Sequence, residues 1–535
     1  MKIGKHVFFI ALLLTLLITR LILINQDIYI DGDQAHSAYM GKLILKESYR
    51  PLFFFDQKIG GGDAILGYIL AIFYFIFGIS IFSAKLTMLF ITCLLFVLLY
   101  IVMNKYFDKR SCFITLTLFV FPFFSFASWN ITILRYMLGF VFHLVIIFLF
   151  YKIIYKRKQS KFFPIIFGFI SGFGSYVFIP NLIIVIIALS LIAFVNLNYY
   201  RKKKIICFIL FFLIGFSPVI YISISSNYHN FVAYNDPFGN HQYLDLNQRL
   251  DDIKNFFSDE LYHSLLVRNL HLYSHESTIL MLSGCLYYII FLFLLLFLII
   301  FNISHIINLV RKKKFNTINP EVIFLVFFIV YSMVYCFYWE KSSVYLSPLF
   351  YVILVLIGTG ISRMISMKTR YSIYFKSLAV ILFLILLLFS INSTSKIIED
   401  KNPQIGTLKI IDFLNENSIH NVYTTLQFVS LIALYDEMKT TTAGVEGRPF
   451  FEKYYHLNKN EAFAIVLPTP ENNRWKEPYY EKLNNALKKF LEEHQVSYKI
   501  TKINGINVYY DFSEYFCLEE YGEDFLRQLT LNKSS

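Results

Sequence analysis

Two adjacent stretches near the start of the chain decide its architecture: the apolar run VFFIALLLTLLITRLILI at residues 7–24 and the polar segment DGDQAH at residues 31–36. A bilayer span needs about 17–25 mainly apolar residues, which the first stretch supplies. It follows two lysines and lacks a small-x-small cleavage site, so we expect an uncleaved span rather than a removed signal peptide. The second stretch places two carboxylates and a histidine directly outside that span. Ionisable groups at a membrane boundary are costly and are usually functional, so residues 31–36 are the leading candidate active site.

The amino-acid composition also indicates a membrane protein. Of 535 residues, 57% are hydrophobic, 19% aromatic and only 16% charged. Soluble domains are about a quarter charged, so we expect an integral membrane protein whose main partner is the lipid bilayer. The net charge of +13 could indicate nucleic-acid binding. However, the basic residues form short clusters between apolar runs, as in Arg201–Lys204 and Arg311–Lys314, which is typical of cytoplasmic loops. We therefore expect no nucleic-acid partner. The cysteines match no disulfide or zinc pattern.

Further apolar runs predict a polytopic helical protein. With the first run they give about eleven spans, the others beginning near Leu86, Cys112, Met137, Phe162, Leu182, Ile205, Thr278, Val322, Val344 and Ile373. One more run, Leu66–Ser80, is shorter and aromatic-rich. The lysines at the N-terminus and Lys105 are both expected on the cytoplasmic side. The chain must therefore cross the membrane an even number of times between them. The first span and the span that begins near Leu86 satisfy this only if Leu66–Ser80 does not cross. We interpret it as a juxtamembrane helix, the alternative being an extra span with one basic loop on the wrong side.

We expect the protein in the inner (cytoplasmic) membrane. The number of spans then places the N-terminus in the cytoplasm and the C-terminus on the extracytoplasmic side. The transmembrane domain is predicted to cover residues 1–395, with outer loops at 25–84 and 225–277. Composition then changes sharply, and residues 396–535 are predicted to form a small extracytoplasmic α/β domain. The expected helices are Leu408–Asn415 and Pro478–His494, and the expected strands are Asn421–Thr425, Ala462–Leu467, Tyr498–Ile503 and Ile506–Asp511. The fold class is thus an α-helical polytopic membrane protein with a small C-terminal domain.

Several local motifs, in this order, resemble the GT-C superfamily of membrane glycosyltransferases, particularly the branch of protein O-mannosyltransferases and lipid A aminoarabinose transferases. Asp33-Gln34-Ala35, followed by Tyr39, is similar to the acidic pair that opens the family's first outer loop, with Gln34 where Glu is usual. Gly78-Ile79-Ser80 and then Lys85-Leu86 resemble the family's juxtamembrane ending, with Lys85 where Arg is common. Other resemblances are Gly168–Gly174, Gly215–Pro218 and Tyr345–Leu349, where Val344 replaces a frequent Arg.

The resemblance implies a chemistry as well as a fold. It implies an inverting glycosyltransferase that moves a sugar from a polyprenyl-phosphate-linked donor to an extracytoplasmic glycan, lipid or protein acceptor. Asp33 would be the general base, and a hydrogen bond from Gln34 could orient it. Asp31 could share a divalent cation with Asp33, since paired carboxylates suit Mg²⁺ or Mn²⁺. The alternative for Asp31 and Asp33 is a solvated turn, because Asp-Gly is a common turn dipeptide.

Other residues are candidates for substrate binding. His36 lies three residues after Asp33, on the same face if the segment is helical, although a plain boundary residue is the commoner role. The leaving phosphate needs cations, and the candidates are Lys85, Arg135, Lys341 and, more remotely, Arg20. We expect Arg20 to extend its side chain to the interface, and a membrane anchor explains Arg135 equally well. Arg448 in the tail could reach sugar or phosphate, or lie in an exposed turn.

Two other functions remain open at the sequence level. Gln34 in place of Glu favours a non-catalytic relative of the fold that acts as a scaffold in envelope glycan assembly. An O-antigen polymerase or ligase, or a transporter, ranks last. Transporters more often have charged residues near mid-membrane, whereas the spans here contain no acidic residues and their basic residues lie near span ends.

Overall fold

A computed structural model describes residues 3–24, 32–47, 49–53, 64–122, 135–155, 162–195, 202–225, 254–257, 261, 278–312, 318–338, 348–399, 405–424, 432–433, 436, 441–444, 462–468 and 478–512. The chain forms two compact units. The first consists of Met1–Gln26, Lys58–Asp63 and Met88–Lys401, and the second of Asp27–Gln57, Ala64–Thr87 and Asn402–Ser535.

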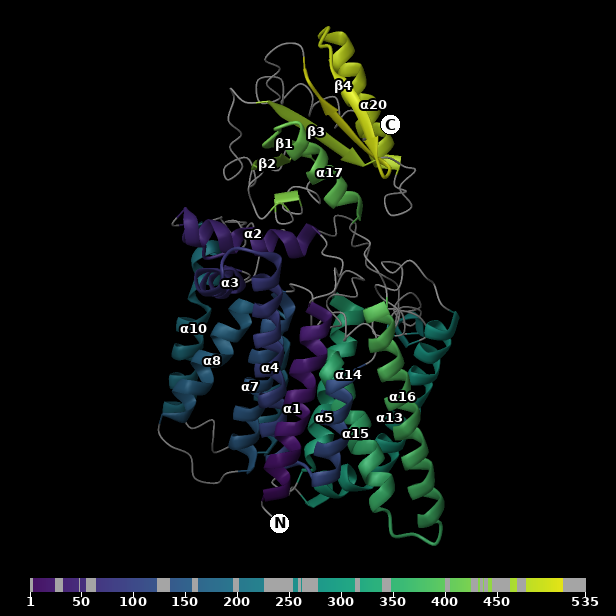
Figure 1. The fold of residues 1–535 in the computed structure, drawn as a ribbon. Coiled ribbons are helices and arrows are strands. Elements are labelled where there is room, and N and C mark those ends of the chain that lie inside the picture. Colours follow the sequence, from purple (N-terminus) through teal and green to yellow (C-terminus); the bar gives the residue numbers. More distant parts are fainter. Residues whose placement is uncertain are drawn as a thin grey trace. The chain divides into compact units, whose positions relative to one another are not determined.

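The first unit is a bundle of apolar helices that run side by side (Figure 1). Each predicted span corresponds to one helix, which confirms the polytopic helical fold: α1 (Ile3–Ile24), α4 (Ile81–Tyr106, which starts in the second unit), α5 (Lys109–Val120), α7 (Arg135–Tyr155), α8 (Phe163–Val177), α9 (Asn181–Val195), α10 (Lys202–Ser225), α13 (Thr278–Lys312), α14 (Pro320–Tyr338), α15 (Leu349–Ser366) and α16 (Ser372–Glu399). In the described part, 7 helices are long and apolar enough to cross a membrane.

Glycines allow two of these helices to approach very closely. A Cβ added at Gly172 of α8 would lie 2.1 Å from the Phe212 carbonyl oxygen of α10, and one at Gly215 would lie 2.5 Å from the Phe169 carbonyl oxygen. Only glycine fits at such backbone contacts, which are common where helices pack in membranes. The glycine-rich motifs noted in the sequence therefore serve the packing of α8 against α10.

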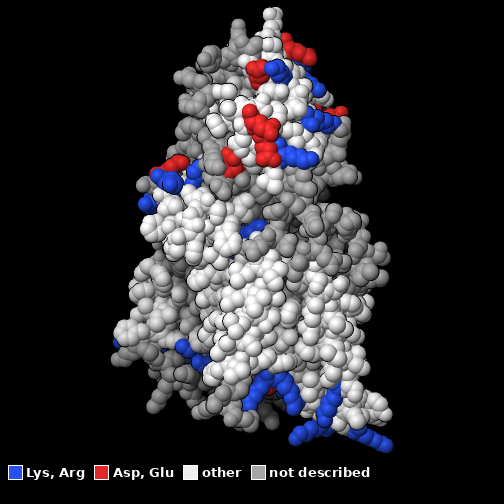
Figure 2. Space-filling model, in the orientation of Figure 1, with Lys and Arg blue, Asp and Glu red and all other residues white. Residues whose placement is uncertain are grey.

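Charge is distributed unevenly along the bundle. Lysines and arginines gather at one end, here called the basic end, while the belt beyond it is almost free of charge (Figure 2). The exposed basic residues there come from helix ends and connecting turns, and include Lys105, Lys109, Arg110, Lys203, Lys368 and Arg370. The belt exposes large apolar side chains such as Ile18, Phe90 and Leu296, as expected of a lipid-facing surface.

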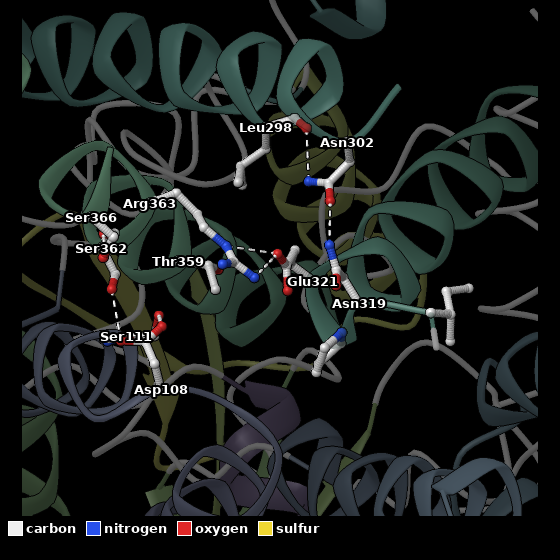
Figure 3. A network of polar contacts seen from close by, with 12 residues as sticks. Asp108, Ser111, Leu298, Asn302, Asn319, Glu321, Thr359, Ser362, Arg363 and Ser366 are labelled. Atoms are coloured by element: carbon white, nitrogen blue, oxygen red, sulfur yellow. Dashed lines mark hydrogen bonds and ion pairs between the residues drawn. The ribbon is translucent and has the colours of Figure 1, made fainter. Parts of the chain in front are cut away.

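A polar network joins α5 to α15 at the basic end (Figure 3). Asp108 caps the N-terminus of α5, accepting hydrogen bonds from the backbone N–H groups of Arg110 and Ser111 at 2.9 and 3.0 Å. The Ser362 hydroxyl of α15 donates to the same carboxylate at 2.8 Å. Burial opposes ionisation of Asp108, but the hydrogen bonds from Ser111, Ser362 and Arg110 outweigh it and lower the pKa of this carboxyl.

A second part of the network joins α13, α14 and α15 (Figure 3). Glu321, 1% exposed in the first turn of α14, accepts a hydrogen bond from Nε of Arg363 at 2.8 Å and also contacts its Nη2. Asn319 donates to Asn302 of α13 at 3.1 Å. Buried polar groups are satisfied here by partners on neighbouring helices, so this end of the bundle is held by specific contacts as well as by apolar packing.

The α/β domain in the second unit contains a 5-stranded sheet with the order β2-β1-β3-β5-β4. The strands are β1 (Asn421–Thr424), β2 (Thr441–Gly444), β3 (Phe463–Pro468), β4 (Lys499–Ile503) and β5 (Ile506–Tyr510). β1 runs parallel to β2 and β3, whereas β5 is antiparallel to both β3 and β4. Helices α17 (Ile405–Glu416) and α20 (Pro478–Glu493) accompany the sheet (Figure 1). Every predicted strand is present, and β2 is an addition to the prediction.

Candidate active site

The predicted active-site segment is helical. Helix α2 (Gly32–Lys46) begins one residue before Asp33, so Asp33 and Gln34 lie in its first turn. A helix N-terminus carries a partial positive charge, which favours an ionised carboxylate there. Asp33 and His36 are three residues apart on this helix, the spacing of neighbours on one helix face. The side chains of Asp33 and Gln34 lie outside the described part of the chain.

Helix α2 packs tightly against α3 (Ala64–Phe77). A Cβ at Gly41 of α2 would lie 2.7 Å from Cβ of Leu70, and one at Gly67 of α3 would lie 2.9 Å from Cε of Met40. Outside this contact α3 is strongly apolar, with the side chains of Phe75 and Ile76 79% and 61% exposed. Its 14 residues span about 21 Å, which is less than the hydrocarbon core. This length agrees with a juxtamembrane helix rather than an extra span.

Two residues of the Gly-Ile-Ser motif make the sharp connection from α3 to α4. Gly78 has φ +82°, a left-handed conformation that ends a helix and favours glycine. Ser80 then caps α4, its Oγ accepting a hydrogen bond from the Ser83 backbone N–H at 3.1 Å. The connection places Lys85 in the second turn of α4, where it is only 4% exposed. A buried lysine is unusual, and its role in binding the leaving phosphate stays a prediction.

The described side chains in the first half of α2 are all buried. His36 and Tyr39 are 3% and 5% exposed, and Lys42 lies over the Tyr39 ring at 5.4 Å from its centroid. Burial, assisted by the negative charge of Glu47, raises the pKa of the Tyr39 phenol above its usual range. Burial also lowers the pKa of Lys42. His36 and Tyr39 are therefore enclosed side chains beside the helix start that carries Asp33.

The side chains of the remaining predicted site residues lie outside the described part of the chain. Asp31, Lys341 and Arg448 lie outside the described residues, and Arg135 begins α7 with its side chain outside them. The prediction of a metal shared by Asp31 and Asp33 falls in the same region. Elsewhere in the described part, no group of three potential metal ligands occurs.

One sequence prediction is wrong, and one feature was missed. Arg20 does not extend its side chain to the interface: it is completely buried, and its Nη2 donates to the Val120 carbonyl at 3.1 Å. His143, buried in α7, was missed because histidine does not interrupt an apolar run as an acid would. Its ring packs edge-on against Tyr351 of α15, with centroids 5.1 Å apart. Neither ring nitrogen has a hydrogen-bond partner among the described residues.

The fold is similar to those of several solved structures. The chain is similar to ArnT from Cupriavidus metallidurans in the apo state, with a TM-score of 0.58, 10% identity, and 95% of this chain and 98% of that chain covered. ArnT bound to undecaprenyl phosphate gives a TM-score of 0.56, 10% identity, and 96% and 99% coverage. The chain has the GT-C fold.

A third similar structure is the Archaeoglobus fulgidus oligosaccharyltransferase in complex with Zn and sulfate. It has a TM-score of 0.52, 13% identity, and 92% of this chain and 72% of that chain covered. No protein-family model and no curated protein sequence matches the chain. The GT-C fold is therefore confirmed by shape at very low identity, in agreement with the resemblance read from the sequence motifs.

Proposed function

We propose that this protein is a membrane glycosyltransferase that uses a polyprenyl-phosphate-linked sugar and acts on an extracytoplasmic glycan, lipid or protein. One observation carries the proposal: the match to ArnT extends over nearly the whole of both chains, and one ArnT structure holds undecaprenyl phosphate. This likeness over the full length supports a polyprenyl-phosphate partner for this chain. The buried Lys85 supplies a cation on α4, within the GT-C-like juxtamembrane motif.

The proposed reaction is a single inverting displacement. Asp33 takes the proton of the acceptor hydroxyl while that oxygen attacks the anomeric carbon. The bond between the anomeric carbon and the phosphate oxygen breaks, and polyprenyl phosphate leaves with the bonding electrons. Gln34 orients the base, and Lys85 stabilises the charge on the phosphate. Asp31 and Asp33 together offer the carboxylate oxygens that Mg²⁺ or Mn²⁺ prefers, so they would hold a divalent ion if the reaction uses one.

The proposed orientation follows from charge. The basic end faces the cytoplasm, because lysines and arginines are retained there. If α1 starts on that side and crosses once, the start of α2 is proposed to be on the outer face of the inner membrane, and the α/β domain is proposed to be extracytoplasmic.

A second candidate is a non-catalytic scaffold in envelope glycan assembly. The observation that favours it is Gln34, which stands where the family pattern has a second carboxylate. An active enzyme needs Asp33 as a base, whereas a scaffold needs only the shape of the bundle. Replacing Asp33 therefore distinguishes an enzyme from a scaffold.

The test compares a deletion strain with strains carrying single substitutions. Mass spectrometry of envelope glycans, lipids and proteins should reveal one sugar lost in the deletion strain and restored by the wild-type chain. Asp33→Asn should fail to restore it although the protein is inserted at normal levels, because an amide cannot accept the proton. Asp27→Asn, in the same loop, is the control and should restore the sugar. Full restoration by both Asp33→Asn and Asp33→Ala would favour the scaffold.

A further inference from the structure

The turn between α15 and α16 combines exposed basic and aromatic side chains at the basic end of the bundle (Figure 2). Lys368 and Arg370 precede α16, and Lys376 lies in its second turn; all three side chains are exposed. Tyr371 and Tyr374 lie between Arg370 and Lys376 in the sequence and are 59% and 72% exposed. These five residues are here called the basic-aromatic turn.

The positive charge of this turn is not neutralised by the described part of the protein. None of the three cations forms an ion pair with a described carboxylate. Asp108, the carboxylate at the start of α5, instead accepts hydrogen bonds from Ser362 and from the α5 backbone. Arg110 adds a fourth cation, because its Nη1 donates to the hydroxyl of Ser366, two residues before Lys368, at 3.4 Å. A cluster of like charges of this kind attracts an anion from outside the protein.

Helix α16 indicates where the membrane boundary lies. Its stretch Ser372–Asn392 is long and apolar enough to span a membrane, and only 11% of its apolar window is buried. Lipid therefore faces α16 on most sides. Ile373 and Ile381, which are 67% and 52% exposed, extend this lipid-facing surface from the turn along the helix. The basic-aromatic turn thus lies where headgroups meet hydrocarbon, the level that Tyr, Lys and Arg side chains favour.

The combination of side chains indicates the chemistry of the partner. Cations alone would suit any anion, including an acidic protein in solution. The exposed tyrosine rings and Ile373 are continuous with the lipid-facing surface of α16, so the partner has to offer an apolar part as well as a negative charge. An anionic phospholipid offers both, because its phosphate lies at the level of the cations and its acyl chains lie along the helix. A zwitterionic headgroup carries its own cation, which offsets the attraction.

We propose that the basic-aromatic turn is a binding site for the headgroup of an anionic phospholipid, whose acyl chains lie along Ile373 and Ile381. The bound lipid contacts the residues on both sides of the start of α16 and so holds this sparsely covered helix at a fixed depth in the bilayer. None of these residues is among those proposed for sugar transfer, so the inference does not depend on that function.

The test is native mass spectrometry of the full chain in detergent, which counts the lipid molecules bound. The two probes are phosphatidylglycerol and phosphatidylcholine with the same acyl chains. The wild-type protein should bind phosphatidylglycerol at least about tenfold more tightly than phosphatidylcholine. In the triple variant Lys368→Gln, Arg370→Gln and Lys376→Gln, this preference should fall to about twofold or less, because the three cations are gone. Tyr371→Ala combined with Tyr374→Ala should weaken the binding of both lipids and leave the preference unchanged.

The matched control removes three cations from the start of α10, as Lys202→Gln, Lys203→Gln and Lys204→Gln. This variant should keep most of the preference for phosphatidylglycerol. An equal loss in the two triple variants would overturn the proposal, because the lipid would then respond only to the total charge of the basic end. An unchanged preference in the variant of the turn would overturn it as well. The ligand-free Tm of the turn variants should match that of the wild type, since the replaced side chains are exposed.

Two soluble competitors test the lipid assignment. Neither glycerol 3-phosphate nor a poly-glutamate peptide should displace phosphatidylglycerol from the wild-type protein, because neither has acyl chains. Displacement by glycerol 3-phosphate would overturn the assignment and leave a site for free phosphate. Displacement by the peptide would overturn it in favour of a docking surface for an acidic protein.

Discussion

Lys85 is the residue whose burial most directly links the fold to the proposed chemistry. It replaces an arginine of the GT-C-like motif and is held in the second turn of α4 by the Gly78 and Ser80 caps. If it stabilises the leaving phosphate, Lys85→Met should reduce transfer by about 100-fold or more, because one lost charge-stabilising contact costs about 3 kcal/mol in the transition state. Lys85→Arg should retain much of the activity. The measurement is the amount of the restored sugar in complemented cells.

A structural role for Lys85 predicts a different pattern. Lys85→Met would then reduce the amount of inserted protein in proportion to the lost sugar. Arginine is also larger than lysine, so a purely packed position would reject Lys85→Arg as well.

Asp108 carries a pH-dependent part of the stability. Its pKa is lowered in the folded state, so its contribution is present above the pKa of the unfolded chain, about 3.9, and is lost as pH falls through the folded value. Asp108→Asn should lower the free energy of unfolding at pH 7 by about 1 kcal/mol, since Asn retains part of the cap. The Tm difference between the two proteins should shrink below about pH 4. A difference that does not change between pH 7 and pH 3 would contradict this explanation.

Individual residues were predicted from the sequence with uneven success. Asp33 was singled out because polar residues after an apolar run signal a membrane boundary, but its position in the first turn of a helix was not predicted. Arg20 was misread because hydropathy places a charge along one helix but does not show which neighbouring helices cover it. Its burial depends on α5, which lies 100 residues further along the chain.

At the scale of elements, helix contacts are decided by small residues at single positions. A Cβ at Gly358 of α15 would lie 2.1 Å from Oγ1 of Thr115 and 3.0 Å from the Thr115 backbone nitrogen on α5. Gly360, two residues further on, meets only side-chain atoms of Leu294, the nearest at 3.3 Å. Gly358→Ala should therefore destabilise the bundle by about 1–3 kcal/mol through overpacking. Gly360→Ala is the control, and we expect a change below about 0.5 kcal/mol.

The measurement is the Tm of each variant in the same detergent. A large loss for Gly360→Ala, or none for Gly358→Ala, would show that the contact between α5 and α15 is less close than described. Because Asp108 and Ser362 join the same two helices, Gly358→Ala should also weaken the pH dependence assigned to Asp108.

Elements were predicted better than contacts. The spans and four of the strands follow from runs of apolar or β-branched residues, and such runs are local. The missed strand β2 has the sequence TTAG, which is short and ends in glycine. It is a strand because β1 offers it a parallel partner, and parallel pairing joins residues distant in sequence. The packing of α2 on α3 was also invisible, since it depends on Gly41 and Gly67 facing each other.

At the scale of the whole molecule, whether the number of membrane crossings is odd or even decides on which side of the membrane the reaction occurs. The described helices from α5 to α16 are odd in number: α5, α7, α8, α9, α10, α13, α14, α15 and α16. If each crosses once, a reporter fused after Lys105 lies on the opposite side from one fused after Asp400. The basic end contains Lys105, so the first should be cytoplasmic and the second outside. Alkaline phosphatase, active only outside, and green fluorescent protein, fluorescent only inside, measure this directly.

The same assay tests whether α3 crosses the membrane. With 14 residues it should lie along the outer face, so reporters after Gln26 and after Ser80 should both be outside. Opposite signals at these two positions would make α3 a span and would move α2, with Asp33, away from the side where Lys85 lies. A base and a phosphate-binding cation on opposite faces cannot serve one displacement. Agreement of the two reporters is therefore a condition that any transferase mechanism built on Asp33 and Lys85 must meet.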